Sequence, residues 1–266
     1  MLTPTSYRPC PTCGSVDCAP ENAYSPDPWQ IVTCDSCALT YLRNPVDYAA
    51  LEEDFAWEKT SVAKRQEVAQ GSSFLSPYIR KLRTKLGILH RDKQSSFRQW
   101  FNDGHVLDIG CGQGNRIQPP MTPYGIELSR GLHANADVQM RKWGGFCQFG
   151  AGAKAIYEFD RTMFDGIVMF SYLEHETDVM GVLKGAHRAL KDDGAVYIRV
   201  PNFGSLNRRI FGKKWCGFRY PDHVNYFTLK SLKDTAARAG FTTKLVNSVT
   251  LPVDDNISVL LRKVSV

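Results

Sequence analysis

Short apolar runs that end in an acidic residue and a turn mark the second half of the chain. The run at 106–109 leads directly into glycines at alternate positions, Gly110, Gly112 and Gly114. A short apolar run of this kind predicts a buried parallel strand, and glycines let the backbone turn tightly and approach a ligand closely. A second run, 124–127, also ends in an acid, Glu127. Doubly wound α/β folds bind nucleotides where a strand enters such a turn, so we expect that fold and that kind of site.

A helical pattern precedes these strands. Apolar residues recur at i, i+3 and i+4 in 47–55 and 74–89, so residues 46–101 form a predicted helical connector. The pattern changes after Gly114, because only 12 residues separate it from Glu127 and three of them are prolines. Proline breaks helices, so we expect the first crossover helix to be about one turn long or missing.

Five of the eight cysteines lie in the first 40 residues and include two C-x2-C pairs with 20 residues between them. Four thiolates suit a closed tetrahedral zinc site, which is structural because no position remains for water. Short β-type segments at 29–33 and 39–42 flank the second pair, so residues 1–45 are predicted to be a zinc ribbon whose metal supplies folding energy. A reduced cluster without metal is the alternative, and Cys18 could replace one ligand. The predicted ligands are Cys10, Cys13, Cys34 and Cys37.

Composition narrows the class of protein. A chain of 266 residues accommodates one main domain and a small module. It has no apolar run of 18 residues, and its first residues lack the apolar core of a signal peptide. We therefore expect a cytoplasmic protein without a membrane span. The net charge of +6 permits an anionic substrate or nucleic acid and requires neither.

A carboxylate at the tip of the second strand can accept both ribose hydroxyls of an adenosine ligand. Together, residues 106–114 and Glu127 resemble the cofactor site of class I S-adenosylmethionine-dependent methyltransferases. The resemblance continues in order through 164–175, 189–202, 223–232 and 239–241. It implies that residues 102–266 form a doubly wound, mostly parallel seven-stranded sheet of Rossmann-like type. It also implies S-adenosylmethionine as cofactor and S-adenosylhomocysteine as product.

The resemblance assigns roles within this site. Asp108 would orient the glycine loop and face the sulfonium, Leu128 would border the adenine, and Phe170 and Ser171 would lie beside the methionine portion. The segment 149–153 departs from the family, because it lacks the acid that usually meets the adenine amino group; Gln148 or a backbone carbonyl would serve instead. The implied cofactor-binding residues are Asp108, Gly110, Cys111, Gly112, Gly114, Glu127, Leu128, Phe170 and Ser171.

Three residues beyond the cofactor segments are candidates for catalysis. His175 lies in a Leu-Glu-His sequence typical of the family, where it either acts as a base or caps the next helix or packs under the cofactor. His223 follows Asp222, which can fix its tautomer, and is the preferred base; a loop histidine bonded to the backbone is the alternative. Tyr220 opens the same segment and is the third candidate.

The insert at 202–221 mixes five Lys or Arg residues with four aromatic residues beyond Phe203 and is expected to cover the mouth of the site as a lid. Such a mixture suits an anionic or sugar-bearing acceptor. In the alternative, its aromatic residues belong to the core and its charges are solvated.

Three functions remain open on the sequence. The favoured one is a methyltransferase for a small or carrier-linked metabolite such as a sugar, nucleotide sugar, glycan or natural-product intermediate, with O-methylation preferred. The second is an RNA methyltransferase that binds RNA through the ribbon and the ten Lys or Arg residues between 59 and 98, which otherwise form a solvated face. The third is a non-catalytic scaffold with a decayed site, against which the retained Asp108 and Glu127 argue.

Overall fold

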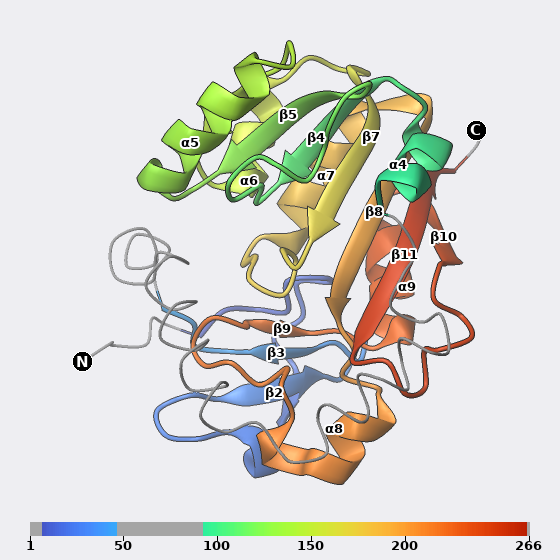
Figure 1. Cartoon of the computed structure of the whole chain (residues 1–266). Coiled ribbons are helices and arrows are strands. Elements are labelled where there is room, and N and C mark those ends of the chain that lie inside the picture. Colours follow the sequence, from blue (N-terminus) through green and yellow to red (C-terminus); the bar gives the residue numbers. More distant parts are fainter. Residues whose placement is uncertain (1–6, 47–92, 265–266) are drawn as a thin grey trace, which may run out of the picture.

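The computed structural model describes residues 7–46 and 93–264. Most of the predicted connector, including the basic stretch and the segment 74–83 that would line the pocket, lies outside these residues. Within the described residues there are two sheets: one of seven strands, and a small one of four strands that lies beyond the carboxyl ends of strands in the larger sheet (Figure 1). No helix in the described parts is long and apolar enough to cross a membrane.

The large sheet has the order β10-β11-β8-β7-β4-β5-β6. Strands β4 to β8 run parallel, and β11 is antiparallel to both of its neighbours. This arrangement confirms the predicted doubly wound, mostly parallel sheet. Its strands are β4 (His105–Ile109), β5 (Thr122–Glu127), β6 (Cys147–Phe149), β7 (Phe164–Phe170), β8 (Leu190–Pro201), β10 (Phe241–Leu245) and β11 (Asn256–Lys263).

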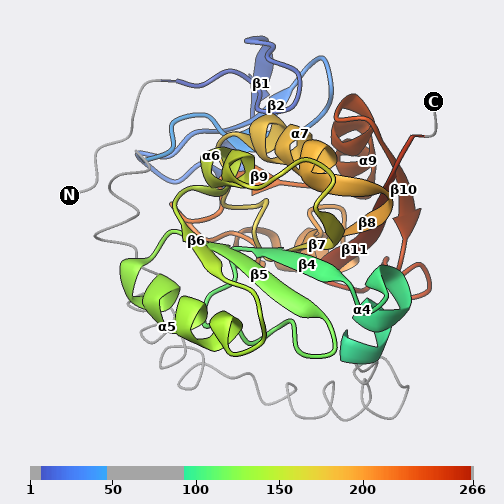
Figure 2. The ribbon, with the colours of Figure 1, turned by 90° about the horizontal axis from the view of Figure 1, so that it is seen from above.

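Helices cover both faces of this sheet (Figure 2). One face carries α4 (Lys93–Phe101) and α5 (Arg130–Arg141), and the other carries α6 (Gly152–Ala155), α7 (Val179–Ala189) and α9 (Leu229–Arg238). Phe101 packs so closely on β7 that a Cβ at Gly166 would lie 2.3 Å from its ring. The remaining helical elements of the described residues are α8 (Leu206–Phe211) and three short turns, η1 (Asn22–Tyr24), η2 (Ile156–Glu158) and η3 (Gly212–Lys214).

The first crossover is a loop. Among the described residues no helix lies between β4 and β5, which confirms the prediction made from the three prolines. Ile117 and Met121 from this loop are fully buried against the face that carries α4, so the loop does the packing that a helix would otherwise do.

Strand β8 is irregular at its start. It begins directly after α7, and its pairing with β7 shifts from Phe164↔Leu190 to Gly166↔Ala195. The extra residues form an irregularity in the ladder of the kind that a β-bulge makes.

The N-terminal module has strands β1 (Cys18–Pro20), β2 (Ile31–Cys34) and β3 (Thr40–Leu42), all antiparallel. Its fourth strand, β9 (Asn225–Tyr226), comes from the far end of the chain and pairs with β3. The small sheet is therefore completed by the segment that follows His223, and it lies beyond the carboxyl ends of β7 and β8 (Figure 1).

Candidate functional site

The glycine loop after β4 adopts the conformation that its glycines predict. Gly110, Gly112 and Gly114 have φ of 71°, 59° and 70°, a region that other residues rarely adopt. A Cβ at Gly112 would meet nothing within 4 Å, so the backbone is open to a ligand there. The amide of Gly112 donates to Glu127 Oε2 over 2.8 Å, and the amide of Ser129 donates to Oε1 over 2.9 Å. Both carboxylate oxygens of Glu127 thus accept from backbone amides, and a carboxylate can accept about four hydrogen bonds in all.

Asp108 ends β4 beneath this loop and is completely buried. Arg116 reaches back from the loop, and its Nη1 lies 2.6 Å from Asp108 Oδ1 and 2.5 Å from Oδ2. Burial raises the pKa of Asp108 to about 6, although the positive charge of Arg116 opposes the shift. The sequence analysis did not single out Arg116, whose signal was a lone cation two residues after the last loop glycine.

Phe170 is the last residue of β7, and two guanidinium groups flank its ring. Those of Arg116 and Arg199 lie 4.8 Å and 4.7 Å from the ring centroid. Ser171 follows with φ of 54°, an uncommon conformation for a residue with a side chain, of the kind that occurs at functional sites. This corner of the site is therefore both aromatic and cationic.

Residues 148–153, where the resemblance puts the adenine, contain no acid. Gln148 on β6 donates from Nε2 to the carbonyl of Phe149 over 3.4 Å. Leu128 is half-buried after β5. Cys111 of the glycine loop is buried, with its Sγ 3.5 Å from the Sγ of Cys147. Cys111 thus packs beneath the loop, and its backbone is the part that can face a ligand.

The structure brings His175 and His223 together. Their ring centroids are 4.7 Å apart, and the rings meet edge to face. His175 Nδ1 lies 2.9 Å from the carbonyl of Asp222, and His223 Nδ1 lies 2.8 Å from that of Gly217. A carbonyl can only accept, so both Nδ1 atoms carry a proton, and in a neutral ring the lone pair is then on Nε2. Burial lowers the pKa of His175 to about 4, so this ring is neutral at physiological pH.

Two further observations bear on the histidine candidates. The side chain that caps α7 is Asp178, which accepts from the amide of Gly181, and not His175. Glu174 is buried beside the pair, burial raises its pKa to about 8, and its Oε2 has no hydrogen-bond partner among the described residues. In the sequence, Glu174 stood out only as the residue before His175 in the Leu-Glu-His sequence.

Tyr220 lies apart from this pair in its contacts. Its hydroxyl donates to the carbonyl of Tyr24 in the N-terminal module over 2.5 Å, and its ring stacks with that of Phe218. Its catalytic role stays a prediction, and the contacts of its side chain are those of a residue that holds the lid on the module.

The four predicted metal ligands converge. Their Sγ atoms all lie within 4.8 Å of one another, and the pairs Cys10–Cys37 and Cys13–Cys34 are separated by 3.5 Å. Tetrahedral zinc thiolates have sulfur atoms about 3.8 Å apart, so the cluster fits zinc. Cys18 lies opposite Cys34 in the β1–β2 ladder and is not one of the four. Ala38, which stands where a glycine is typical, has φ of 57° and completes the second tight turn.

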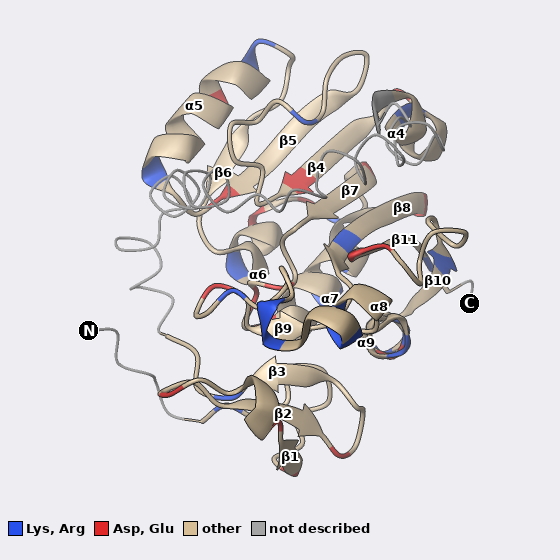
Figure 3. Ribbon diagram, turned by 60° about the horizontal axis from the view of Figure 1, so that its bottom comes forward, with Lys and Arg blue, Asp and Glu red and all other residues tan. Residues whose placement is uncertain are grey.

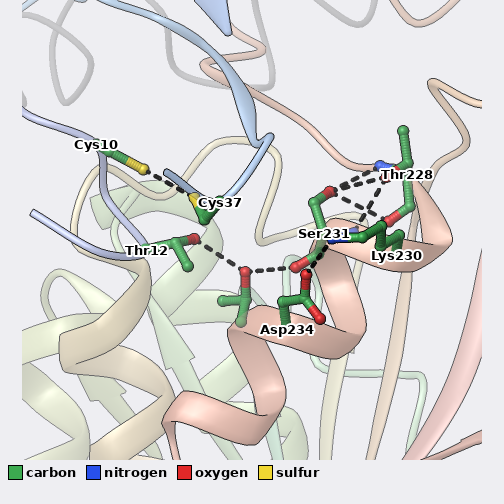
Figure 4. A network of polar contacts seen from close by, with 8 residues as sticks. Cys10, Thr12, Cys37, Thr228, Lys230, Ser231 and Asp234 are labelled. Atoms are coloured by element: carbon green, nitrogen blue, oxygen red, sulfur yellow. Dashed lines mark hydrogen bonds and ion pairs between the residues drawn. The ribbon is translucent and has the colours of Figure 1, made fainter. Parts of the chain in front are cut away.

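The module is joined to the large sheet through α9 and through Arg8. The buried hydroxyl of Thr12, which lies between the two cysteines of the first pair and is labelled in Figure 4, is 2.9 Å from the hydroxyl of Thr235 on α9. Arg8 donates to the carbonyls of Leu42, Thr177 and Val224 and to Oδ1 of Asn225. Its guanidinium therefore ties β3 to β9 and to the loop that carries His175.

The insert at 202–221 places three of its aromatic residues in a core, as the alternative reading expects. Trp215, Phe218 and Tyr220 pack with Tyr24 and Trp29 of the N-terminal module, so these aromatic residues belong to a core. Ile210 and Phe211 on α8 are 73% and 58% exposed, and Lys and Arg positions gather around this helix (Figure 3).

Comparisons with known proteins identify the large domain. A sequence model of a methyltransferase domain matches residues 67–245, more than half of the chain. A solved SAM-dependent methyltransferase from Methanosarcina mazei is 16% identical, with a TM-score of 0.50, and the match covers 64% of this chain and 97% of that one. The YcgJ protein from Bacillus subtilis is 20% identical with a TM-score of 0.46, and the match covers 54% of this chain and 64% of that one. No curated protein sequence matches the chain at comparable significance.

Proposed function

Because the chain belongs to this methyltransferase-domain family and is an S-adenosylmethionine-dependent methyltransferase, we propose that its acceptor is a small or carrier-linked metabolite. In-line transfer to an acceptor oxygen is the favoured reaction. Sugars, nucleotide sugars, glycan ends and natural-product intermediates are the acceptor types considered.

One observation carries the cofactor part of the proposal. Asp108 and Glu127 end neighbouring parallel strands on either side of a loop in which Gly112 leaves open space. Glu127 would accept the ribose hydroxyls, and Asp108 would face the sulfonium end, where its charge complements the positive charges of the methionine portion, including the ammonium. Bound there, S-adenosylmethionine supplies an electrophilic methyl group whose displacement needs only correct alignment.

Acceptor activation is assigned to the histidine pair. His223 donates its Nδ1 proton to the carbonyl of Gly217, so its Nε2 would take the hydroxyl proton as the acceptor oxygen attacks. His175 would hold the ring of His223 by edge-to-face contact. The lid and the N-terminal module would exclude water from this side of the site.

The cysteine cluster is proposed to hold one zinc ion with a structural role. Its four thiolates complete the tetrahedral shell, so the metal would keep no position for substrate. The ion would fix the two turns that carry Thr12 and β3, and through them the segment around His223.

No observation on the described residues favours the RNA alternative. The basic stretch that suggested it lies mostly outside them, and Arg98, which lies inside, is paired with Asp103. A decayed scaffold is disfavoured because the loop conformation, Glu127 and Asp108 are all in place.

Calorimetric titration of S-adenosylhomocysteine into the zinc-loaded protein tests the proposal first. We expect a micromolar Kd, about −8 kcal/mol, that is lost in Glu127→Ala and kept in the matched control Glu158→Ala. Absence of binding by the wild type would contradict the proposed cofactor site and the activity that depends on it. Given binding, turnover is then sought with labelled cofactor in low-molecular-mass extract fractions and, in parallel, with RNA at rising salt.

A further inference from the structure

A second group of potential metal ligands lies at the acceptor side, apart from the cysteine cluster. One carboxylate oxygen of Glu174 and one nitrogen from each of His175 and His223 all lie within 4.8 Å of one another. Two imidazoles and one carboxylate are the donor set of mononuclear sites that keep open positions for a substrate.

Each of the two rings is held by a hydrogen bond at Nδ1. Each Nδ1–H is donated to a backbone carbonyl, that of Asp222 for His175 and that of Gly217 for His223. This outer contact fixes the tautomer and leaves Nε2 as the donor atom, the arrangement that supports nearly all metal-bound histidines.

Glu174 supplies the independent observation. Its side chain is 1% exposed, and its Oε2 has no hydrogen-bond partner among the described residues. A buried carboxyl oxygen without a partner carries a desolvation cost, and a cation that binds there would satisfy the oxygen and displace the carboxyl proton.

We propose that Glu174, His175 and His223 bind a divalent transition-metal ion such as Mn²⁺, and that this ion coordinates the acceptor oxygen. The proposal rests on the proposed function for the position of the acceptor, and it changes the role of His223 from base to ligand. Coordination would make the acceptor hydroxyl more acidic, so its proton leaves to water. The oxygen then bonds to the methyl carbon as the carbon–sulfur bond breaks, the electron pair stays on sulfur, and the metal keeps its oxidation state.

Two nearby cationic side chains limit the affinity that we expect for the metal ion. The charges of Arg199 and Arg219 both act on Glu174 and oppose a further cation. We therefore expect a Kd on the order of 10 μM, weaker than that of a closed site. The same two guanidinium groups favour an acceptor that carries a negative charge next to the oxygen that is methylated.

The test uses the full-length, zinc-loaded protein titrated with Mn²⁺, with free Mn²⁺ followed by electron paramagnetic resonance. Mn²⁺ prefers oxygen and nitrogen ligands to thiolates, so the cysteine cluster keeps its zinc, and zinc content is measured afterwards. We expect one Mn²⁺ per chain. Glu174→Gln and His223→Ala should each weaken binding at least tenfold, whereas His187→Gln, a histidine on α7 that packs against Phe241, should not.

S-adenosylhomocysteine binding is measured on every variant to separate the outcomes. A variant that binds the cofactor product but not Mn²⁺ supports the metal site. Failure of the wild type to bind Mn²⁺, or equal binding by all variants, while S-adenosylhomocysteine still binds, overturns the metal site and leaves His223 as the base. Loss of S-adenosylhomocysteine binding by the wild type would instead contradict the proposed function. Glu174→Gln preserves side-chain shape, so it decides the matter if His223→Ala does not fold.

Discussion

Asp108 combines complete burial, an ion pair with Arg116 and a pKa raised to about 6. Below that pH the carboxyl is neutral and cannot attract the ammonium of the cofactor's amino-acid end; above it the carboxylate can. We therefore predict that affinity for S-adenosylhomocysteine rises about tenfold between pH 5 and pH 7 and then levels off. Calorimetry at pH 5, 6, 7 and 8 measures this rise.

The charges of Arg116 and Glu127 both act on Asp108. A substitution of Arg116 therefore provides a control for the titration of Asp108. Arg116→Met removes the cation that stabilises the carboxylate, so the midpoint of the affinity curve should move to higher pH. Asp108→Asn should bind more weakly at every pH with a flat profile. A flat profile in the wild type would show that Asp108 does not titrate with ligand binding.

One guanidinium bridges the pairing of β3 with β9. Arg8 donates to three carbonyls and to Asn225 Oδ1 across β3, β9 and the loop after β7. Arg8→Met would remove the guanidinium donor from these acceptors, although the carbonyl of Val224 would still accept from the amide of Leu42. We predict a loss of about 2–4 kcal/mol in the free energy of unfolding. Urea unfolding measures it. Arg43→Met, which removes a cation stacked on Tyr7 in the same module, should change stability by less than about 0.5 kcal/mol.

Some of these elements could be predicted from the sequence, and others could not. The parallel strands and the missing crossover helix follow from local patterns, since apolar runs, glycine turns and prolines act on their own neighbourhood. The pairing of β9 has no local pattern, because a strand of two residues next to a histidine segment resembles a loop. The Asp108–Arg116 pair and the unpartnered Glu174 likewise depend on side-chain positions that appear only once the loop and sheet are folded.

At the scale of the whole molecule, the N-terminal module and the large domain share one apolar core. Leu39 and Tyr41 of the module belong to the same buried cluster as Leu107 and Val200 of the large sheet. The predicted domain bounds therefore do not separate two independent cores, and we expect a single cooperative unfolding transition in the zinc-loaded protein.

The shared core leads to a prediction for removal of the zinc. Cys13→Ser should abolish zinc binding, lower the melting temperature and release β3 from β9, which follows His223 directly in the chain. The glycine loop and Glu127 lie at the ends of β4 and β5 of the large sheet, away from the β3–β9 pair, so S-adenosylhomocysteine should still bind. Methyl transfer, which needs His223 in place, should fall at least tenfold. Zinc content, thermal unfolding and both functional measurements are compared with Cys216→Ser, an exposed cysteine outside the cluster, which should match the wild type. Full turnover by a zinc-free Cys13→Ser protein would mean that the module folds without its metal and that His223 keeps its place without it.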